Sequence, residues 1–189
     1  MPKKFVLFLS VAQTILSFLH WLLYLMLLHF FPALRPVHTV LLAVVLLCSV
    51  SFLLFSTAVH FMGWRILDWG YMLSGSLLVL AGYGFWFLLA ALALSSAWPA
   101  ASTVFAAAAL LGSLLMTVYG LINARIIRVR HINVALPNLP EFWRNKTAVA
   151  AADIHLGNIL REGFARKVVR AINTQRPDIV FLPGDYYDG

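Results

Sequence analysis

Two short apolar runs flank a helical stretch in residues 147–185, TAVAAADIHLGNILREGFARKVVRAINTQRPDIVFLPGD. The first run, residues 147–153, is small and apolar and leads into polar residues, as a short buried strand does. The second run, residues 178–182, is rich in β-branched and aromatic residues. Between them, residues 162–174 have the spacing of an amphipathic helix. The order of strand, helix and strand predicts a parallel βαβ unit.

Polar side chains follow both predicted strands: Asp153 and His155 follow the first, and Asp185 follows the second. Sites in open α/β sheets form outside the carboxyl ends of the strands, so these three residues are expected on one rim. On an extended backbone, side chains two residues apart point the same way, so Asp153 and His155 could hold one divalent metal. A carboxylate on this rim could bridge two metals, as in two-metal phosphoester hydrolysis.

A plainer interpretation of the same residues stays open. Asp153 would cap the following turn, and His155 would be a surface residue. Asp185 and Asp188 would then be turn residues beside Gly189.

The segment upstream of the βαβ unit also has a strand-like pattern. Residues 125–134, RIIRVRHINV, partly alternate polar with β-branched side chains, and Pro137 and Pro140 follow. We therefore assign residues 123–146 to a connecting strand and linker, and 147–189 to the βαβ unit.

The charged residues are concentrated in this last third of the chain. Charged residues make up 11% of the sequence and hydrophobic residues 62%, whereas a soluble domain carries about 25% charge. This composition excludes a disordered chain, and the single cysteine, Cys48, excludes a disulfide scaffold. The net charge of +7 comes without a basic stripe interleaved with aromatic residues, so nucleic acid is not an expected partner.

Residues 1–122 contain four apolar stretches of the length that a transmembrane helix needs, roughly 20 residues. They cover residues 5–31, 37–62, 71–94 and 100–122, and turn-forming residues separate them. The first stretch is much longer than the core of a signal peptide, so we expect it to remain uncleaved. The prediction is a four-helix transmembrane domain in a multi-pass integral membrane protein.

The basic residues near the span ends predict its orientation. One face has Arg35, and the opposite face has six basic residues: Lys3, Lys4, Arg65, Arg125, Arg128 and Arg130. The N-terminus and all residues after 122 are therefore expected in the cytoplasm, with the plasma membrane as the host bilayer.

Several polar residues lie within or near the spans. His29, His60, Arg65 and Asp68 fall at span ends, where snorkelling is sufficient to explain them. His20 lies deeper and is interpreted as a neutral residue paired between helices. Polar residues within a membrane are also candidates for transport, so a transporter or channel subunit that uses His20 stays open.

The motif Asp153-Ile154-His155-Leu156-Gly157, followed by PDIVFLPGDYYDG at residues 177–189, resembles the opening of a calcineurin-like metallophosphoesterase. The wider resemblance is to its membrane-anchored branch, which includes YkuE-type phosphohydrolases and the transmembrane protein with a metallophosphoesterase domain. It covers about residues 125–189; the spans match in arrangement only. It implies an α/β sandwich, two divalent ions (Mn, Fe or Zn), and metal ligands at Asp153, His155 and the bridging Asp185. Ala152 and Pro183 depart from the Ser or Thr that the family often has there.

The family's later Gly-Asn-His and Gly-His-x-His segments, including its catalytic histidine, have no counterpart in residues 1–189. The resemblance thus implies an N-terminal piece of a longer enzyme, inactive alone. The predicted function of that enzyme is membrane-anchored hydrolysis of phosphomonoesters or phosphodiesters, with a lipid-linked substrate suggested by the anchor. The alternative is a non-enzymatic four-helix membrane scaffold.

Overall fold

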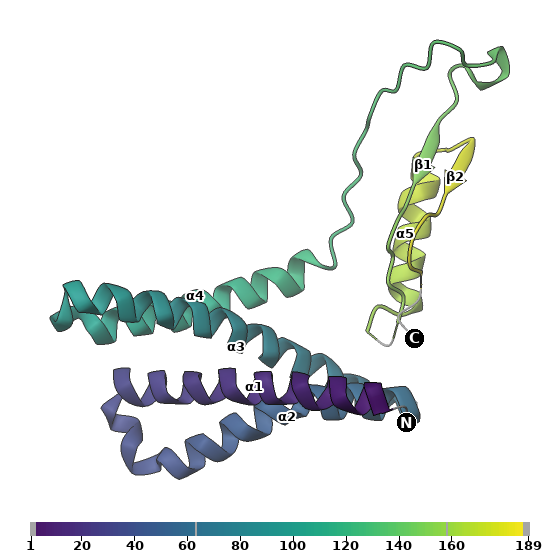
Figure 1. Cartoon of the computed structure of the whole chain (residues 1–189). Coiled ribbons are helices and arrows are strands. Elements are labelled where there is room, and N and C mark those ends of the chain that lie inside the picture. The colour runs from purple at the N-terminus through teal and green to yellow at the C-terminus, as the bar shows by residue number, and fades with distance from the viewer. Residues whose placement is uncertain (1–2, 63, 158, 187–189) are drawn as a thin grey trace. The chain divides into compact units, whose positions relative to one another are not determined.

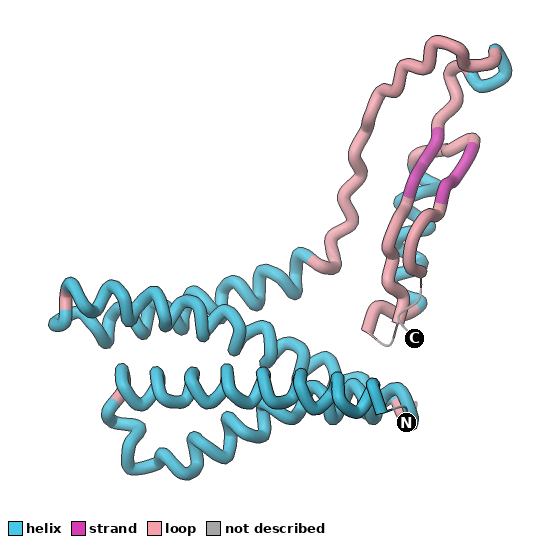
Figure 2. Tube along the Cα trace, in the orientation of Figure 1, coloured by secondary structure: helices cyan, strands magenta, loops and turns pink. Residues whose placement is uncertain are grey.

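The computed structural model describes residues 3–62, 64–157 and 159–186. The chain divides into two compact units, Met1–Asn123 and Ala124–Gly189. The first unit is helical, and the strands of the described residues lie in the second (Figure 1, Figure 2).

Four long helices form the first unit. They are α1 (Lys3–Phe30), α2 (His38–Met62), α3 (Arg65–Ala97) and α4 (Ser102–Asn123). Short 3₁₀ turns, η1 (Pro32–Val37) and η2 (Pro99–Ala101), join α1 to α2 and α3 to α4, so that each pair runs in opposite directions (Figure 1). All four are long and apolar enough to cross a membrane, in agreement with the four apolar helices predicted.

The connection between the second and third spans is shorter than predicted. Residues 63–70 were expected to form a loop, but α3 begins at Arg65, so the described part of this segment is mostly helical. Gly63 lies outside the described residues. Asp68 falls in the first turn of α3, where a carboxylate is stabilised by the exposed N–H groups at the start of a helix.

Helix α3 packs more extensively than any other helix of the first unit, chiefly against α4 and α2. Small residues let the helices approach closely, as in other membrane helix bundles. At Gly70, an added Cβ would overlap the Phe55 ring of α2. The main apolar cluster of buried residues comprises Phe30, Leu88, Ala91, Ala106 and Ala109.

Polar side chains also lie inside the bundle, and most bond to their own helix. The hydroxyl of Ser113 donates to the carbonyl of Ala109 over 2.7 Å, and the Thr117 hydroxyl donates to Ser113 over 2.8 Å. Gln13 makes a different bond, because its Nε2 donates to the carbonyl of Ser49 over 3.1 Å and so joins α1 to α2.

The second unit contains the predicted βαβ motif. Strand β1 (Ala148–Ala150) pairs in parallel with β2 (Ile179–Phe181), with Val149 opposite Val180. Helix α5 (Glu162–Thr174) connects them and has the predicted bounds. Four of its apolar side chains are half-buried: Phe164, Val168, Ala171 and Ile172. A 3₁₀ turn, η3 (Glu141–Trp143), precedes β1.

The predicted strand over residues 125–134 is wrong for this structure. Residues 126–136 have no regular secondary structure, and Ile132 and Val134 are 72% and 71% exposed. The alternating pattern is a property of the sequence, but a strand also needs a neighbour to bond with. Within the described residues the sheet has two strands, so it does not form an α/β sandwich.

Candidate metal site

The loops after β1 and β2 run side by side at the carboxyl ends of the strands. The N–H of Ala151 donates to the carbonyl of Phe181 over 2.9 Å and continues the strand pairing. Further along, the N–H of His155 donates to Asp185 over 3.3 Å, and that of Leu156 donates to Tyr186 over 2.7 Å. These backbone bonds bring the segments of Asp153, His155 and Asp185 together on one rim.

Asp153 and Asp185 are also joined through a side chain. The N–H of Asp185 donates to Oδ1 of Asp153 over 3.2 Å. Gly184 lies against the same carboxylate, with φ of +90°. A Cβ at this position would overlap Oδ1 of Asp153 and lie 3.0 Å from its Cγ. The close approach of the two loops therefore requires glycine at residue 184.

The backbone at Asp153 and His155 is not extended, contrary to prediction. Their φ angles are +49° and +48°, in the left-handed region that few non-glycine residues adopt. The expectation that their side chains point the same way relied on an extended segment, and that premise is wrong. Left-handed residues of this kind cost energy and cluster at functional sites, which makes the loop a candidate site on independent grounds.

The metal-binding role of the three side chains remains a prediction. Asp153, His155 and Asp185 are exposed and offer carboxylate oxygens and an imidazole, the donors that Mn, Fe and Zn accept. Within residues 3–62, 64–157 and 159–186, however, no three His, Cys, Asp or Glu side chains gather closely enough to hold a metal ion. The described residues thus fit a metal centre in chemistry but not as a completed ligand set. Asp188 lies outside the described residues.

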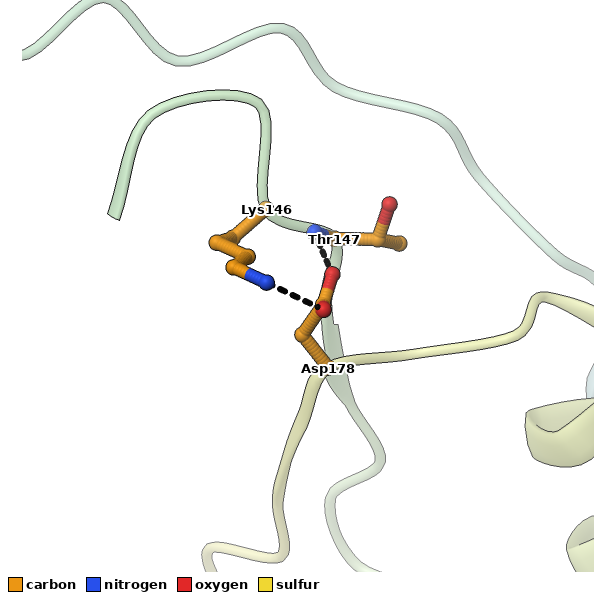
Figure 3. Close-up of polar contacts among 3 residues, drawn as sticks. All are labelled: Lys146, Thr147 and Asp178. Atoms are coloured by element: carbon orange, nitrogen blue, oxygen red, sulfur yellow. Dashed lines mark hydrogen bonds and ion pairs between the residues drawn. The ribbon is translucent and has the colours of Figure 1, made fainter. Parts of the chain in front are cut away.

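A second carboxylate organises the opposite end of the two strands. Asp178, which the sequence did not single out, accepts hydrogen bonds from the N–H of Thr147 and from Nζ of Lys146, both over 2.9 Å (Figure 3). The Thr147 N–H and then the Lys146 ammonium hold the pKa of the Asp178 carboxyl below its usual value. The signal in the sequence was an aspartate directly before an apolar run and after Pro177, a position suited to bonding the backbone.

Comparison with known proteins gives two partial similarities. An uncharacterized metallophosphoesterase of Campylobacter jejuni is 38% identical over 60 residues, which are 32% of this chain and 15% of that protein. A transmembrane protein with metallophosphoesterase domain from Danio rerio is 32% identical over 81 residues, 42% of this chain and 18% of that protein. Part of this chain is similar to metallophosphoesterases.

These similarities are short, since the chain spans less than a fifth of the length of either relative. No family profile matches the chain, and no solved structure matches it.

Proposed function

We propose that this chain is part of a membrane-anchored, metal-dependent phosphoesterase. The observation that carries the proposal is the pairing of two strand-end loops through Asp153, Gly184 and Asp185. It is supported by the partial similarity to two metallophosphoesterases, one of them a transmembrane protein, and by four helices long enough to span a membrane.

In this proposal Asp153 and His155 would hold one divalent ion, and Asp185 would be a ligand shared with a second. Two such ions (Mn, Fe or Zn) would activate water and offset the charge that develops on a phosphate ester. The chain's own contribution is orientation. The Asp185 N–H donates to Oδ1 of Asp153. Because a carboxylate accepts about four hydrogen bonds or metal contacts, Oδ2 remains a candidate metal ligand.

The proposed enzyme needs ligands beyond these three, so residues 1–189 alone are expected to be inactive. We further propose the finer membrane-anchored branch of the calcineurin-like family, a complete α/β sandwich in the whole protein, and a phosphomonoester or phosphodiester substrate that is lipid-linked. We also propose, from the positive-inside bias, that the βαβ unit lies in the cytoplasm, and that the host bilayer is the plasma membrane.

A non-enzymatic membrane scaffold is the second candidate function. The observation that favours it is the lack of a three-residue metal-ligand group within the part of the chain that the structure describes. Metal binding separates the two candidates, because a scaffold has no need of it.

The test begins with the protein purified from its own membranes, with its intact mass measured. Hydrolysis of bis(p-nitrophenyl) phosphate is then assayed with Mn²⁺, Fe²⁺ or Zn²⁺, and after chelation. The proposal predicts metal-dependent turnover. Asp153→Asn should lower it by about tenfold to a hundredfold or more, since loss even of a residue that supports a metal ligand costs about that much.

The matched control is Asp178→Asn, which changes the same residue type at the opposite end of the same two strands. It should keep most of the activity. Equal activity in Asp153→Asn and the unmodified protein, or no bound metal in the intact protein, would favour the scaffold.

A further inference from the structure

The buried His20 of α1 is closed to ligands in this structure. Its Nδ1 lies 2.8 Å from the carbonyl oxygen of Leu16 in the same helix, and its Nε2 is buried without a hydrogen-bond partner among the described residues. The predicted pairing of His20 between helices is therefore wrong for this part of the chain. Charge is concentrated instead in the second unit, where four charged side chains of α5 are exposed.

Helix α5 has a half-buried apolar side and an exposed, mainly basic side. The exposed side carries three cations and one carboxylate: Arg166, Lys167, Arg170 and Glu162. At neutral pH these four side chains have a net positive charge. The outward surface of the helix is therefore suited to an anionic partner.

The carboxylate engages one of the three cations. Oε1 of Glu162 accepts hydrogen bonds from Nη2 of Arg166 over 2.6 Å and from its Nε over 3.2 Å. The two side chains are 77% and 74% exposed, so water screens this ion pair and it contributes little to stability. Within the described residues, Lys167 and Arg170 have no ion pair, so their charge is not neutralised by this part of the chain.

Arg166 and Arg170 border a shallow depression on this exposed side. The rest of its lining is Ala165, Val169, Asn173 and Thr174, so no carboxylate among the described residues lines it. Val169 lies three residues after the first arginine and directly before the second, and it is 54% exposed. Guanidinium groups pair bidentately with phosphates, and an exposed apolar side chain among cations suits the interface of a bilayer.

The chain keeps this surface within reach of a bilayer. Helix α4 is long and apolar enough to cross a membrane and ends at Asn123, whereas β1 begins at Ala148. The residues between them, 124–147, span at most about 85 Å when fully extended. This tether gives the lipid surface a high effective concentration at α5, an advantage that a freely diffusing anionic partner lacks.

We propose that the exposed side of α5 docks on the anionic surface of the bilayer that the helical unit spans. Arg166 and Arg170 pair with the anionic groups of lipid headgroups, Lys167 adds attraction, and Val169 makes the apolar contact at the interface. This docking rests on the proposed membrane anchor and on anionic lipid in the facing leaflet. It does not depend on the metal site, so loss of hydrolysis and loss of docking are separate outcomes.

The test uses the full chain in nanodiscs of phosphatidylcholine alone or mixed with phosphatidylserine, each with a trace of gadolinium-chelating lipid. Paramagnetic broadening of the α5 amide signals then reports how often the helix lies at the lipid surface. Phosphatidylserine should raise this broadening at least about fivefold, the factor that corresponds to one basic residue at an anionic surface. High salt should remove the difference. Equal broadening in the two lipids would overturn the proposal.

Variants then locate the effect. Arg170→Gln should lower the phosphatidylserine-dependent broadening about fivefold, and the double change Arg166→Gln with Arg170→Gln should nearly abolish it. Arg144→Gln is the matched control, because Arg144 is an exposed arginine outside α5, and it should leave the broadening unchanged. These side chains are exposed, and unchanged α5 amide shifts confirm that the variants are folded.

Two results would contradict the assignment to α5. Undiminished broadening in the folded double variant would show that other cations of the chain hold the unit at the membrane. A soluble anion gives the second result. If glycerophosphoserine shifted the same amides as strongly in nanodiscs without phosphatidylserine, the depression would bind a free anion rather than a lipid surface.

Discussion

The backbone N–H of Asp185 donates a hydrogen bond to Oδ1 of Asp153 across 3.2 Å. This bond joins two loops that are about 30 residues apart in the chain but follow paired parallel strands. It orients the Asp153 carboxylate with a backbone group rather than with another side chain. The geometry depends on Gly184, whose missing side chain lets the backbone reach the carboxylate.

Gly184→Ala should separate the two loops. The new methyl group would overlap Oδ1 of Asp153, and alanine disfavours the φ of +90° at this residue. We expect a loss of unfolding free energy of about 2 kcal/mol or more in the second unit, since strain and overlap add. Hydrogen exchange of the Asp185 amide should accelerate correspondingly.

Gly163→Ala is the matched control for this change. Gly163 lies in the first turn of α5, and a Cβ there would meet nothing within 4 Å. Alanine in a helix is favoured over glycine by about 0.5–1 kcal/mol, so this variant should be neutral or slightly more stable. A Gly184→Ala protein that exchanges Asp185 as slowly as the unmodified chain would contradict the proposed loop contact.

The Asp178 carboxyl should make the pairing of β1 and β2 less stable at acid pH. Its pKa is lowered in the folded state, first by the Thr147 N–H and then by Lys146. Because the pKa of Asp178 is lower in the folded than in the unfolded state, the ionised carboxylate stabilises the fold above the unfolded-state pKa of about 4. This stabilisation is lost as the pH falls through the folded-state pKa. A ¹³C NMR titration of the Asp178 carboxyl in micelles should therefore give a midpoint below 4.

Lys146→Gln separates the two causes of this shift. It removes the ion pair but leaves the Thr147 N–H in place. The pKa of Asp178 should rise toward its usual value but remain below it, since the backbone bond is the larger cause. A full return to the usual value would show that the lysine alone is responsible.

Much of the fold follows from local sequence patterns. The four apolar stretches were predictable because a helix satisfies its backbone hydrogen bonds within one apolar segment long enough to span a bilayer. Residues 162–174 were predictable because their apolar side chains recur on one helix face. The pairing of residues 148–150 with 179–181 followed from the order of strand, helix and strand. The strand predicted over residues 125–134 was wrong because alternation shows that a segment could form a strand, but not whether a partner strand lies beside it.

That Asp153, His155 and Asp185 lie on one rim was predictable, but their backbone geometry was not, and their metal-binding role stays a prediction. Asp153 and His155 were placed on an extended segment because the preceding run is strand-like, yet both adopt left-handed φ. A single sequence contains little information about such angles at non-glycine residues, because the tertiary bonds to Asp185 and Tyr186 hold them there.

Arg176→Gly should strengthen the end of α5. Arg176 follows the last residues of the helix with φ of +49°, and its N–H donates to the carbonyl of Asn173 over 3.0 Å. Glycine is the usual residue at a left-handed helix end because it has no Cβ penalty, which is roughly 1 kcal/mol or more. We expect thermal unfolding of the second unit to shift upward, as followed by the amides of α5.

Gln175→Gly provides the contrast for this variant. Gln175 directly follows α5 with φ of −78°, a right-handed conformation in which glycine relieves no strain. It should be neutral or destabilising. If both glycine variants changed stability equally, the left-handed angle at Arg176 would not be the cause.

Gln13 should contribute to the association of α1 with α2. Its Nε2 donates to the Ser49 carbonyl of α2 over 3.1 Å and to the Ser17 hydroxyl over 2.9 Å. Interhelical hydrogen bonds in membranes are worth about 0.6 kcal/mol on average and up to about 2 kcal/mol, so Gln13→Leu should destabilise the bundle by an amount in this range. Steric-trap unfolding of the full chain in bicelles measures it.

Thr14→Val is the control on the neighbouring residue. The Thr14 hydroxyl donates to Ser10 within α1 over 2.8 Å and is exposed, so its removal leaves contacts between helices unchanged. Its unfolding free energy should match that of the unmodified protein within about 0.5 kcal/mol. If Gln13→Leu also fell within that margin, the bond to Ser49 would add nothing to bundle stability. The association of α1 with α2 would then depend on apolar packing and on the contact of 3.5 Å between the Ser17 and Ser49 hydroxyls.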